Sequence, residues 1–281
     1  MHELKDKVAV LTGAASGFGR ELALLCAAAG MRLVLADIDE AGLEETERLL
    51  APHGVQTLRA HCDVRKPEAL DALAEQTYAR FGAAHLLFNN AGVAVAGPAW
   101  SATLEDWKWV LDVNLMGVVH GIRSFVPRML ESGEPGHVVN TASVAGLLSV
   151  MASSVYCVSK HGVVTLSECL HHDLQMVNAP IGVSVLCPAF VNTGIADSGR
   201  HRPAELAARN PLAAPFEAQV RKAVQSGRIS AAEVAQMTLD AVREGRFYIL
   251  THPKIKGAIE TRMRDILDER LPTNTSVGKK A

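Results

Sequence analysis

The sequence has little net charge, few aromatic residues and no long uncharged apolar run. Its 281 residues include 28 Lys and Arg against 30 Asp and Glu, a formal net charge of −2, and aromatic residues make up only 5%. Scattered basic residues in a nearly neutral chain give no reason to expect binding to nucleic acid or to an anionic lipid surface. No uncharged apolar run approaches the length of a membrane span, and the charged residues 1–7 lack an apolar signal core.

Cysteine is also sparse, and its pattern argues against a disulfide framework. The cysteines are odd in number, widely spaced and set within apolar segments. They are Cys26, Cys62, Cys157, Cys169 and Cys187. Such residues are expected to be reduced, buried thiols, which predicts a cytoplasmic protein. No Cys and His spacing matches a metal site, so no metal is expected, and His171-His172 reads as a surface pair on a helix.

The chain does contain a regular alternation of strand-length apolar runs and helical patterns. The predicted strands are Val8–Thr12, Arg32–Ile38, Thr57–Cys62, His85–Asn89, His137–Thr141, Val183–Leu186 and Phe247–Thr251. The predicted helices are 17–29, 40–50, 67–80, 103–130 with an interruption near Gly117, 155–174, 230–244 and 253–270. Strands that are apolar on both faces belong in a parallel sheet covered by helices on each side. We therefore expect an α/β fold with a doubly wound, seven-stranded parallel sheet.

No linker, low-complexity block or charge run divides the chain, so residues 1–270 are expected to form a single domain. The segment 193–226, here called the 193–226 excursion, breaks the rhythm with Pro203, Pro211 and Pro215 and only short helical patterns. A long excursion inside a compact domain is usually a lid or a binding loop, and we predict a substrate-binding lid. Residues 271–281 are predicted to be a flexible C-terminal tail.

A glycine-rich turn joins the first predicted strand to the first predicted helix. The segment TGAASGFG at residues 12–19 carries glycines at 13, 17 and 19, which allow the backbone to approach a pyrophosphate at the helix N-terminus. Asp37 ends the second strand, where an acid can hydrogen-bond the adenosine ribose and repel a 2′-phosphate. Ile38 follows it, and nothing nearby would attract that phosphate. This context predicts a dinucleotide site for NAD. Asp39 is the better candidate for a helix cap.

Tyr156 and Lys160 lie four residues apart in a long apolar run that reads as a buried helix. Residues at this spacing lie on one helical face, so the phenol and the ammonium point the same way. A nearby cation favours the phenolate, so Lys160 is expected to lower the tyrosine pKa and provide a base or acid usable near neutral pH. A core Tyr beside a solvent-reaching Lys would give the same pattern, so the pair needs support from elsewhere in the chain.

That support comes from motifs that occur in order along the chain. They are the glycine pattern at 12–19, Asp63-Val64, Asn89-Asn90-Ala91-Gly92, the set Asn114, Ser143, Tyr156 and Lys160, and Pro188 after the sixth strand. With these motifs the chain resembles the short-chain dehydrogenase/reductase family over nearly its full length, to about Thr251. The resemblance implies a Rossmann fold and an NAD-dependent oxidoreductase that acts on alcohols or ketones. The domain 1–270 would then be both dinucleotide-binding and catalytic.

The resemblance implies a role for each catalytic position. Tyr156 would exchange a proton with the substrate oxygen, and Ser143 would hydrogen-bond the same oxygen. Lys160 would bind the nicotinamide ribose and lower the tyrosine pKa. Asn114 would organise a water that links Lys160 to solvent. Two hydroxyl donors aimed at one oxygen suit a reaction in which alkoxide character develops there.

The cofactor contacts are also implied by the resemblance. They are Gly13, Ser16, Gly17, Phe18, Gly19, Asp37, Asp63, Val64, Asn90, Ala91, Gly92, Tyr156, Lys160, Pro188, Val191 and Thr193. A turn acid at Asp63 is the competing interpretation, and Asn89 is expected to be a structural hydrogen-bonding residue at the strand end. Phe18 stands where the family more often has Ile, and Ala189 where it often has Gly.

Three segments are expected to border the substrate: 93–100, 145–153 and 190–216. The predicted lining residues are Val95, Trp100, Ser143, Leu147, Met151, Tyr156, Phe190 and Ile195. Apart from Ser143 and Tyr156 they are apolar. Arg200, His201 and Arg202 are expected to face solvent as lid residues, with the alternative that one of them turns inward. We therefore predict a bulky, largely uncharged secondary alcohol or ketone, aryl-substituted or steroid-like.

Alternative functions remain open at this point. An acyl-thioester β-ketoreductase would use NADPH, against which Asp37 argues. A non-catalytic NAD-sensing module would usually have lost the tyrosine or the lysine. A nucleotide-sugar epimerase would need a larger C-terminal substrate domain. In the resembling family the helices corresponding to 103–130 and 152–177 pair across a two-fold axis, so we expect a homotetramer, with a homodimer as the alternative.

Overall fold

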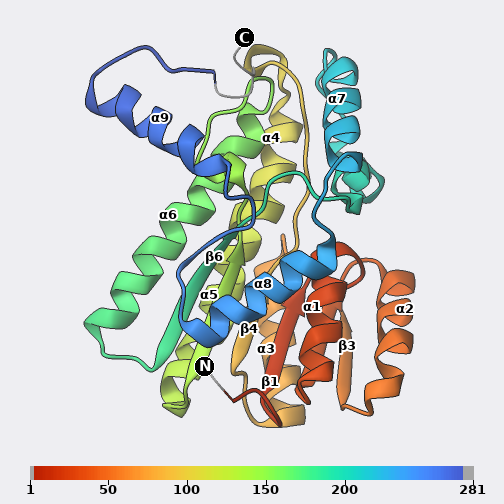
Figure 1. Cartoon of the computed structure of the whole chain (residues 1–281). Helices are drawn as coiled ribbons and strands as arrows, with labels where there is room; N and C mark the ends of the chain where they lie inside the picture. The colour runs from red at the N-terminus through yellow and green to blue at the C-terminus, as the bar shows by residue number, and fades with distance from the viewer. Residues whose placement is uncertain (1–2, 275–281) are drawn as a thin grey trace.

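Seven segments pair side by side as parallel strands in the computed structural model, which describes residues 3–274 (Figure 1). The strands are β1 (Val8–Thr12), β2 (Arg32–Asp37), β3 (Thr57–His61), β4 (Leu86–Asn89), β5 (Gly136–Thr141), β6 (Ile181–Cys187) and β7 (Tyr248–Leu250). Their order across the sheet is β3-β2-β1-β4-β5-β6-β7. The predicted doubly wound Rossmann fold is confirmed, and the strand ends differ from the predicted ones by one or two residues.

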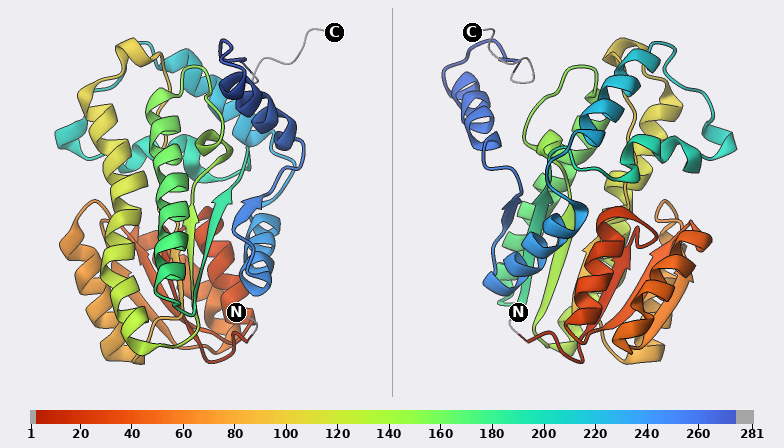
Figure 2. Two further views of the ribbon diagram at one scale, coloured as in Figure 1. Left: turned by 90° about the vertical axis from the view of Figure 1, so that its left-hand side faces the viewer. Right: turned by 45° about the vertical axis from the view of Figure 1, so that its right-hand side comes forward.

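Helices cover both faces of the sheet. They are α1 (Gly17–Ala28), α2 (Glu40–Leu50), α3 (Pro67–Phe81), α4 (Leu104–Leu111), α5 (Gly117–Ser132), α6 (Ser154–Met176), α7 (Ala214–Gln225), α8 (Ala231–Glu244) and α9 (Ile255–Leu267). Helices α1, α2 and α8 pack on one face, and α3 to α6 pack on the other (Figures 1 and 2). Strand β1 shows why its residues are apolar throughout. Ala9 and Leu11 pack into the core beneath α1, α2 and α8, while Val8 and Val10 pack into the core on the opposite face, beneath α3 to α6.

The predicted interruption near Gly117 is a π-helical turn, Asp112–Met116, between α4 and α5. A π-turn adds a residue to the helical register and is frequent at functional sites. Here it carries Asn114, which is fully buried beneath the carboxyl ends of the strands. A continuous α-helix would rotate this side chain away from its present partners.

The 193–226 excursion is more helical than its sequence suggests. It contains the 3-10 segments η5 (Gly194–His201) and η6 (Ala204–Leu206), followed by the twelve-residue α7. Pro215 lies in the first turn of α7, where a missing N–H has no cost, so the proline begins a helix instead of preventing one.

A buried ion pair anchors the middle of this excursion to α4. Arg202 donates to Asp106 at 2.6 Å, and the two side chains are only 4% and 2% exposed. The guanidinium also donates to the carbonyls of Leu206 and Ala208 and lies over the Trp109 ring. The expectation that Arg202 faces solvent is therefore wrong, because its carboxylate partner lies about 100 residues earlier in the chain.

Asp106 is a junction in its own right. It completes a capping box with Thr103 at the start of α4, and its carboxylate also accepts a hydrogen bond from the backbone N–H of Asn210 at 3.0 Å. Asn210 in turn donates to the carbonyl of Pro98. One buried carboxylate thus holds a helix start and two distant turns together.

The cysteines are all free thiols, and four of them are buried as expected. Cys169, on α6, is exposed, which corrects the prediction for that residue. Within residues 3–274, no helix is both long and apolar enough to cross a membrane. Of the predicted tail, residues 275–281 lie outside the described part of the chain.

The Asp106 junction predicts a large and local stability effect. Asp106→Asn should lower the free energy of unfolding by about 3 kcal/mol, because the buried Arg202 loses its counter-charge. Asp240→Asn is the matched control: its partner Arg243 is partly exposed, and the loss should be below about 1 kcal/mol. Both values come from urea denaturation, and equal losses in the two variants would contradict the assigned importance of the buried pair.

Candidate active site

A cavity of about 690 Å³ opens at the carboxyl ends of the strands. This is the edge at which ligands bind in open parallel sheets, and the volume is in the range of small-molecule sites. The loops after β1, β2, β3, β4, β5 and β6 all contribute to its wall, together with the 193–226 excursion. Residues far apart in the sequence therefore meet in one site.

The glycine-rich loop forms one end of this cavity. Gly13 and Gly17 have φ of +69° and +54°, a conformation that favours glycine. A β-carbon on Gly19 would lie 2.0 Å from the Gly13 carbonyl oxygen, so only glycine permits this close turn onto α1. Asn90 donates from its side chain to the Thr12 carbonyl at 3.2 Å and braces the loop from below. The result is an open backbone cradle at a helix N-terminus.

Asp37 lies beside this cradle with both carboxylate oxygens already oriented. They accept hydrogen bonds from the backbone N–H groups of Ala15 and Asp39, each at 3.0 Å. Asp39 caps α2 by accepting from the Gly42 N–H, as the sequence predicts. The carboxylate of Asp37 is therefore held rigidly at the wall of the cavity, where it can still accept from a ligand hydroxyl.

Asp63 and Arg65 form a second charged group on the same side. Arg65 holds the Asp63 carboxylate through several hydrogen bonds, the shortest 2.7 Å, and this pairing and the Arg65 charge lower the pKa of Asp63 against the opposing effect of burial. Arg65 also lies 3.5 Å from Glu205 in η6. The sequence reasoning did not identify Arg65, although its position two residues after Asp63 allows this local pairing.

The four predicted catalytic residues converge at the other end of the cavity. Ser143, Tyr156 and Lys160 line it, and Asn114 lies just behind the wall. Asn114 accepts from the Val93 N–H at 2.8 Å and donates to Ser159 at 3.0 Å, so its side chain is fixed from both sides. Ser143 donates to the Pro188 carbonyl at 3.3 Å.

Lys160 is a buried cation with one protein carbonyl as its partner. It is 3% exposed and donates to the Thr141 carbonyl at 2.8 Å. Burial lowers the pKa of Lys160 to about 8, because a desolvated ammonium is unfavourable. Its nitrogen lies 5.8 Å from the centre of the Tyr156 ring.

The pKa of Tyr156 is raised by burial to about 12, with only partial compensation from the Ser143 hydroxyl. The expectation that Lys160 lowers this pKa is therefore not met in the protein alone. The physical reason is that the phenol and the ammonium are both desolvated, and desolvation disfavours both charged forms. The pair is close in space, as its spacing predicts, but its proton affinities are set by burial.

The substrate side of the cavity agrees only in part with the predicted lining. Val95, Met151, Phe190 and Ile195 line it, together with Ser143 and Tyr156. Trp100 does not, because it is 85% exposed on the outer surface, and Leu147 packs into the core beside Val164 and Val185 instead. Both predictions are wrong. A residue can lie in a segment that borders the cavity and still direct its side chain away from it.

Other cavity residues were not anticipated. Helix α7 contributes Phe216 and Val220, and α9 contributes Ile255 and Ala258. Arg200 and His201 also line the cavity, although they were expected to face solvent. For the residues of α7 the sequence did contain a signal, the amphipathic pattern after Pro215. The prolines of the 193–226 excursion made that pattern difficult to recognise as a helix.

Most of the predicted nucleotide contacts lie together along this cavity. Of that set, Gly19 alone lies beneath the loop and does not reach the wall. The cradle without β-carbons, the free N–H groups of α1 and the fixed Asp37 fit a dinucleotide with a diphosphate and a ribose diol. Among the described residues no group of His, Cys, Asp and Glu could hold a metal ion.

Comparison with known proteins gives the same picture. A family model described as short chain dehydrogenase matches residues 7–204. A CLA biosynthesis dehydrogenase/reductase of Lactiplantibacillus plantarum is 35% identical over 277 residues, which cover 97% of both chains. A 1-deoxy-11-beta-hydroxypentalenate dehydrogenase of Streptomyces avermitilis is 36% identical over 268 residues, 95% of this chain and 92% of that one.

A solved structure extends the similarity to three dimensions. A short chain dehydrogenase/reductase from Burkholderia phymatum, crystallised in complex with NAD, is 48% identical and superposes with a TM-score of 0.95. The alignment covers 97% of this chain and 98% of the other.

Proposed function

The chain belongs to the short-chain dehydrogenase/reductase family, and we propose that it transfers a hydride between NAD(H) and a bulky, largely apolar secondary alcohol or its ketone. As a member of this family it is a nucleotide-dependent oxidoreductase of alcohols or ketones. The observation that carries the proposal is the convergence of Ser143, Tyr156 and Lys160 at one end of a cavity whose other end is the glycine cradle.

The cradle and Asp37 would hold the dinucleotide, which supplies the hydride chemistry when bound. The protein must then manage one proton and one oxygen. Tyr156 gives a proton to the substrate oxygen in ketone reduction and takes it back in alcohol oxidation, and the Ser143 hydroxyl orients the same oxygen. Burial raises the pKa of Tyr156 in the protein alone, and the positive charge of an oxidised nicotinamide ring bound beside it would favour the tyrosinate.

Asn114 serves this arrangement as a positioning residue. Its side chain is occupied by Val93 and Ser159, so it fixes the loop after β4 against α6. The π-turn that carries it breaks the regular helical hydrogen bonding at this point. Such a break leaves backbone carbonyls able to hold a water, which agrees with a proton path from Lys160 to solvent.

The cofactor assignment to NAD rests on Asp37. A 2′-phosphate on the adenosine ribose would approach a carboxylate that is fixed by two backbone N–H groups and cannot turn away without losing them. Ile38 offers no compensating cation. The bound NAD of the Burkholderia relative supports the same choice.

The substrate assignment rests on the wall around Tyr156. Val144, Leu148, Val150 and Met151 line this region beside Phe190, and no acidic side chain is among the lining residues here. Apolar walls favour apolar ligands by the area that they remove from water. The Streptomyces relative is named as a dehydrogenase of 1-deoxy-11-beta-hydroxypentalenate, a hydroxylated compound, which supports an alcohol as the substrate here.

The 193–226 excursion is proposed to cover this substrate. Ile195, Phe216 and Val220 bring it into the cavity wall, and Phe190 precedes it with half of its surface exposed. Closure of such a segment excludes water from the reacting atoms. Because Arg202 and Asn210 are anchored to α4, we expect movement to be concentrated in α7 and its flanking turns.

Assembly as a homotetramer, with a dimer as the alternative, is proposed from an uncovered seam on α6. Val158, Thr165, Cys169 and Met176 are exposed at successive spacings of seven, four and seven residues, which place them along one face of the helix. Helices α5 and α6 lie side by side on this face of the molecule (Figure 2, left). A two-fold axis there would cover both helices.

Replacement of Tyr156 tests the chemistry. Tyr156→Phe should lower kcat by about 10³-fold, since the proton donor is lost, while NADH still binds. Steady-state kinetics and a fluorescence titration with NADH measure the two effects. Cys157→Ser, at a neighbouring buried position outside the cavity wall, should retain kcat within a small factor. Comparable turnover in Tyr156→Phe would remove the tyrosine from its role.

Cofactor preference tests the electrostatic assignment of Asp37. The wild-type ratio of kcat/KM for NAD over NADP should be at least about 100, the scale of a repelled buried charge. Asp37→Ala should reduce this ratio, mainly through a lower KM for NADP. Glu44→Ala is the control, because Glu44 is an exposed acid of α2 outside the cavity wall and should leave the ratio unchanged. Equal use of the two cofactors by the wild type would sink the assignment.

A substrate panel tests the proposed function most directly. With NAD, an aryl-alkyl carbinol should exceed a short aliphatic alcohol and a 3-hydroxyacyl thioester in kcat/KM by about tenfold or more, because it fills the apolar wall. The measurement is the appearance of NADH. A thioester or a small hydroxy acid that wins by a similar factor would show that the pocket assignment is wrong, while the catalytic set would stand.

The α6 seam predicts the state of assembly. Light scattering at micromolar concentration should give the mass of a tetramer or a dimer, and Thr165→Glu should shift it toward smaller species by placing a charge in the covered seam. Gln76→Glu on the exposed face of α3 is the matched control and should leave the mass unchanged. A wild-type monomer would overturn the proposal.

A further inference from the structure

The nucleotide side of the cavity has several carboxylates and no basic residue in its glycine loop. On the nucleotide side the wall carries the carboxylates of Asp37, Asp39 and Asp63. The glycine loop, residues 12–19, contains no Lys or Arg. Arg20 follows it, but its guanidinium is bonded to the carbonyls of Ala15 and Gly42 and to Thr46, beneath the loop. A diphosphate in the cradle would therefore meet N–H groups without a cation from the loop itself.

Two arginines line the cavity in the described part of the chain, Arg65 and Arg200. Arg65 is committed to Asp63 and lies near Glu205, so its charge is already matched. Within residues 3–274 Arg200 makes no ion pair: it donates only to the carbonyls of Gly194 and Asp197, at 3.3 and 3.1 Å, through one nitrogen. The nearest acid on its own segment, Asp197, is paired with Arg221 of α7 instead.

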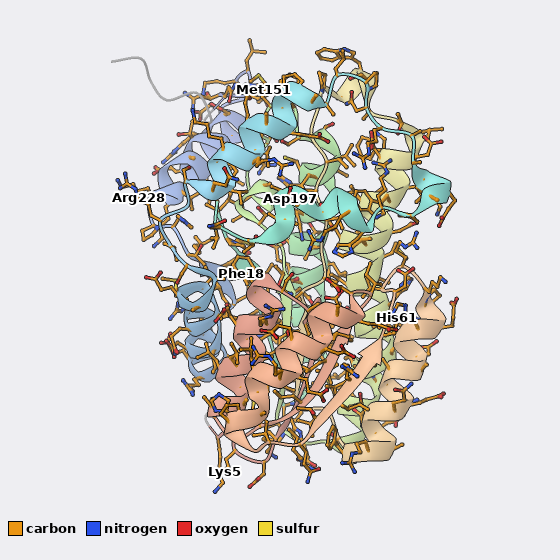
Figure 3. All side chains as sticks on the ribbon, turned by 90° about the vertical axis from the view of Figure 1, so that its right-hand side faces the viewer. Lys5, Phe18, His61, Met151, Asp197 and Arg228 are labelled. Carbon is orange, nitrogen blue, oxygen red and sulfur yellow. The ribbon has the colours of Figure 1, made fainter. Side chains whose placement is uncertain are left out.

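The segment that carries Arg200 crosses the nucleotide end of the cavity. At its start, Thr193 lies 3.5 Å from the place of a β-carbon on Gly17, and a β-carbon on Gly194 would lie 3.4 Å from the Arg200 guanidinium. Beyond its end, Glu205 approaches Arg65 beside Asp63. Figure 3 shows Asp197 on this segment above Phe18 at the start of α1. Ser198 fixes the segment through the backbone of Ala94.

We propose that Arg200 is an anion-binding residue of the 193–226 excursion that contacts the diphosphate of the dinucleotide from the side opposite the glycine loop. This inference rests on the proposed function. A carboxylate on the substrate is the other anion that could meet Arg200. The placement of η5 between the glycine loop and the Asp63–Arg65 pair favours the diphosphate, since the substrate oxygen must lie at Ser143 and Tyr156.

Such a contact would make nucleotide binding and closure of the excursion mutually dependent. A guanidinium can donate two N–H groups to phosphate oxygens, and one nitrogen of Arg200 is already positioned by the two carbonyls of its own segment. The bound diphosphate would complete the hydrogen bonding of η5, and η5 would in turn screen the diphosphate from water.

Calorimetric binding to the full-length protein tests the proposal. The ligands are NADH, ADP-ribose, which keeps the diphosphate without nicotinamide, and adenosine, which lacks it. Arg200→Met should raise the Kd for NADH and for ADP-ribose by about tenfold, leave adenosine unchanged, and flatten the salt dependence of NADH binding. Arg200→Lys should lie between the two. Arg209→Met removes a guanidinium that does not line the cavity and should bind all three ligands as the wild type does.

The outcomes separate this inference from the proposed function. If the wild type binds neither NADH nor ADP-ribose, the proposed function fails. If the wild type binds both and Arg200→Met binds them equally well, the inference fails and the function stands. If Arg200→Met leaves the Kd for NADH and ADP-ribose unchanged and raises the KM only for an alcohol that bears a carboxylate, Arg200 binds the substrate. This result would also overturn the inference. Equal losses of affinity for NADH in Arg200→Met and Arg209→Met would show that the positive charge of the excursion acts at long range and not through a contact of Arg200. That result would also overturn the inference.

Discussion

The arrangement of the site depends on one buried cation. The ammonium of Lys160 lies among apolar helices and strands, where an unpaired charge is costly, and it donates a hydrogen bond to the Thr141 carbonyl. Its surroundings are built to admit it: a β-carbon at Gly92 would lie 3.6 Å from its nitrogen, and Asn114 lies beside the same glycine. A lowered lysine pKa and a raised tyrosine pKa are the two consequences of that burial. The protein thus keeps an unfavourable pair in place for the sake of what binds beside it.

The segments around Lys160 differ in how firmly they are anchored to the rest of the protein. Asn114 and Ser159 hold the loop after β4 against α6 through side-chain hydrogen bonds in a fully buried region. The 193–226 excursion is anchored at its middle by the Arg202–Asp106 pair, and its later part, α7, exposes most of its surface. Rigid support beneath the reacting atoms and a less constrained cover above them suit an enzyme that must exclude water and still release product.

Charge is distributed along the cavity in the order in which a dinucleotide would meet it. Asp37 is held by backbone N–H groups at the ribose end, and Asp63 is neutralised by Arg65 nearby. The glycine loop supplies no cation, and Arg200 of the excursion lines the same cavity. The far end is apolar apart from the catalytic groups. In the proposed function, selection among nucleotides and selection among substrates are therefore made by different walls of one cavity.

Local pattern determined the elements of this protein, and tertiary contact decided how their side chains are used. Strands apolar on both faces, the glycine spacing at 12–19 and the four-residue separation of Tyr156 and Lys160 are properties of neighbouring residues, so the fold class and this pair could be predicted from local pattern. Asn114 and Ser143 joined the pair only through the family resemblance. The burial of Arg202, the outward turn of Trp100 and the inward packing of Leu147 depend on partners many residues away. The same holds for the raised pKa of Tyr156, because desolvation is set by everything that surrounds a group and not by its neighbours in the chain.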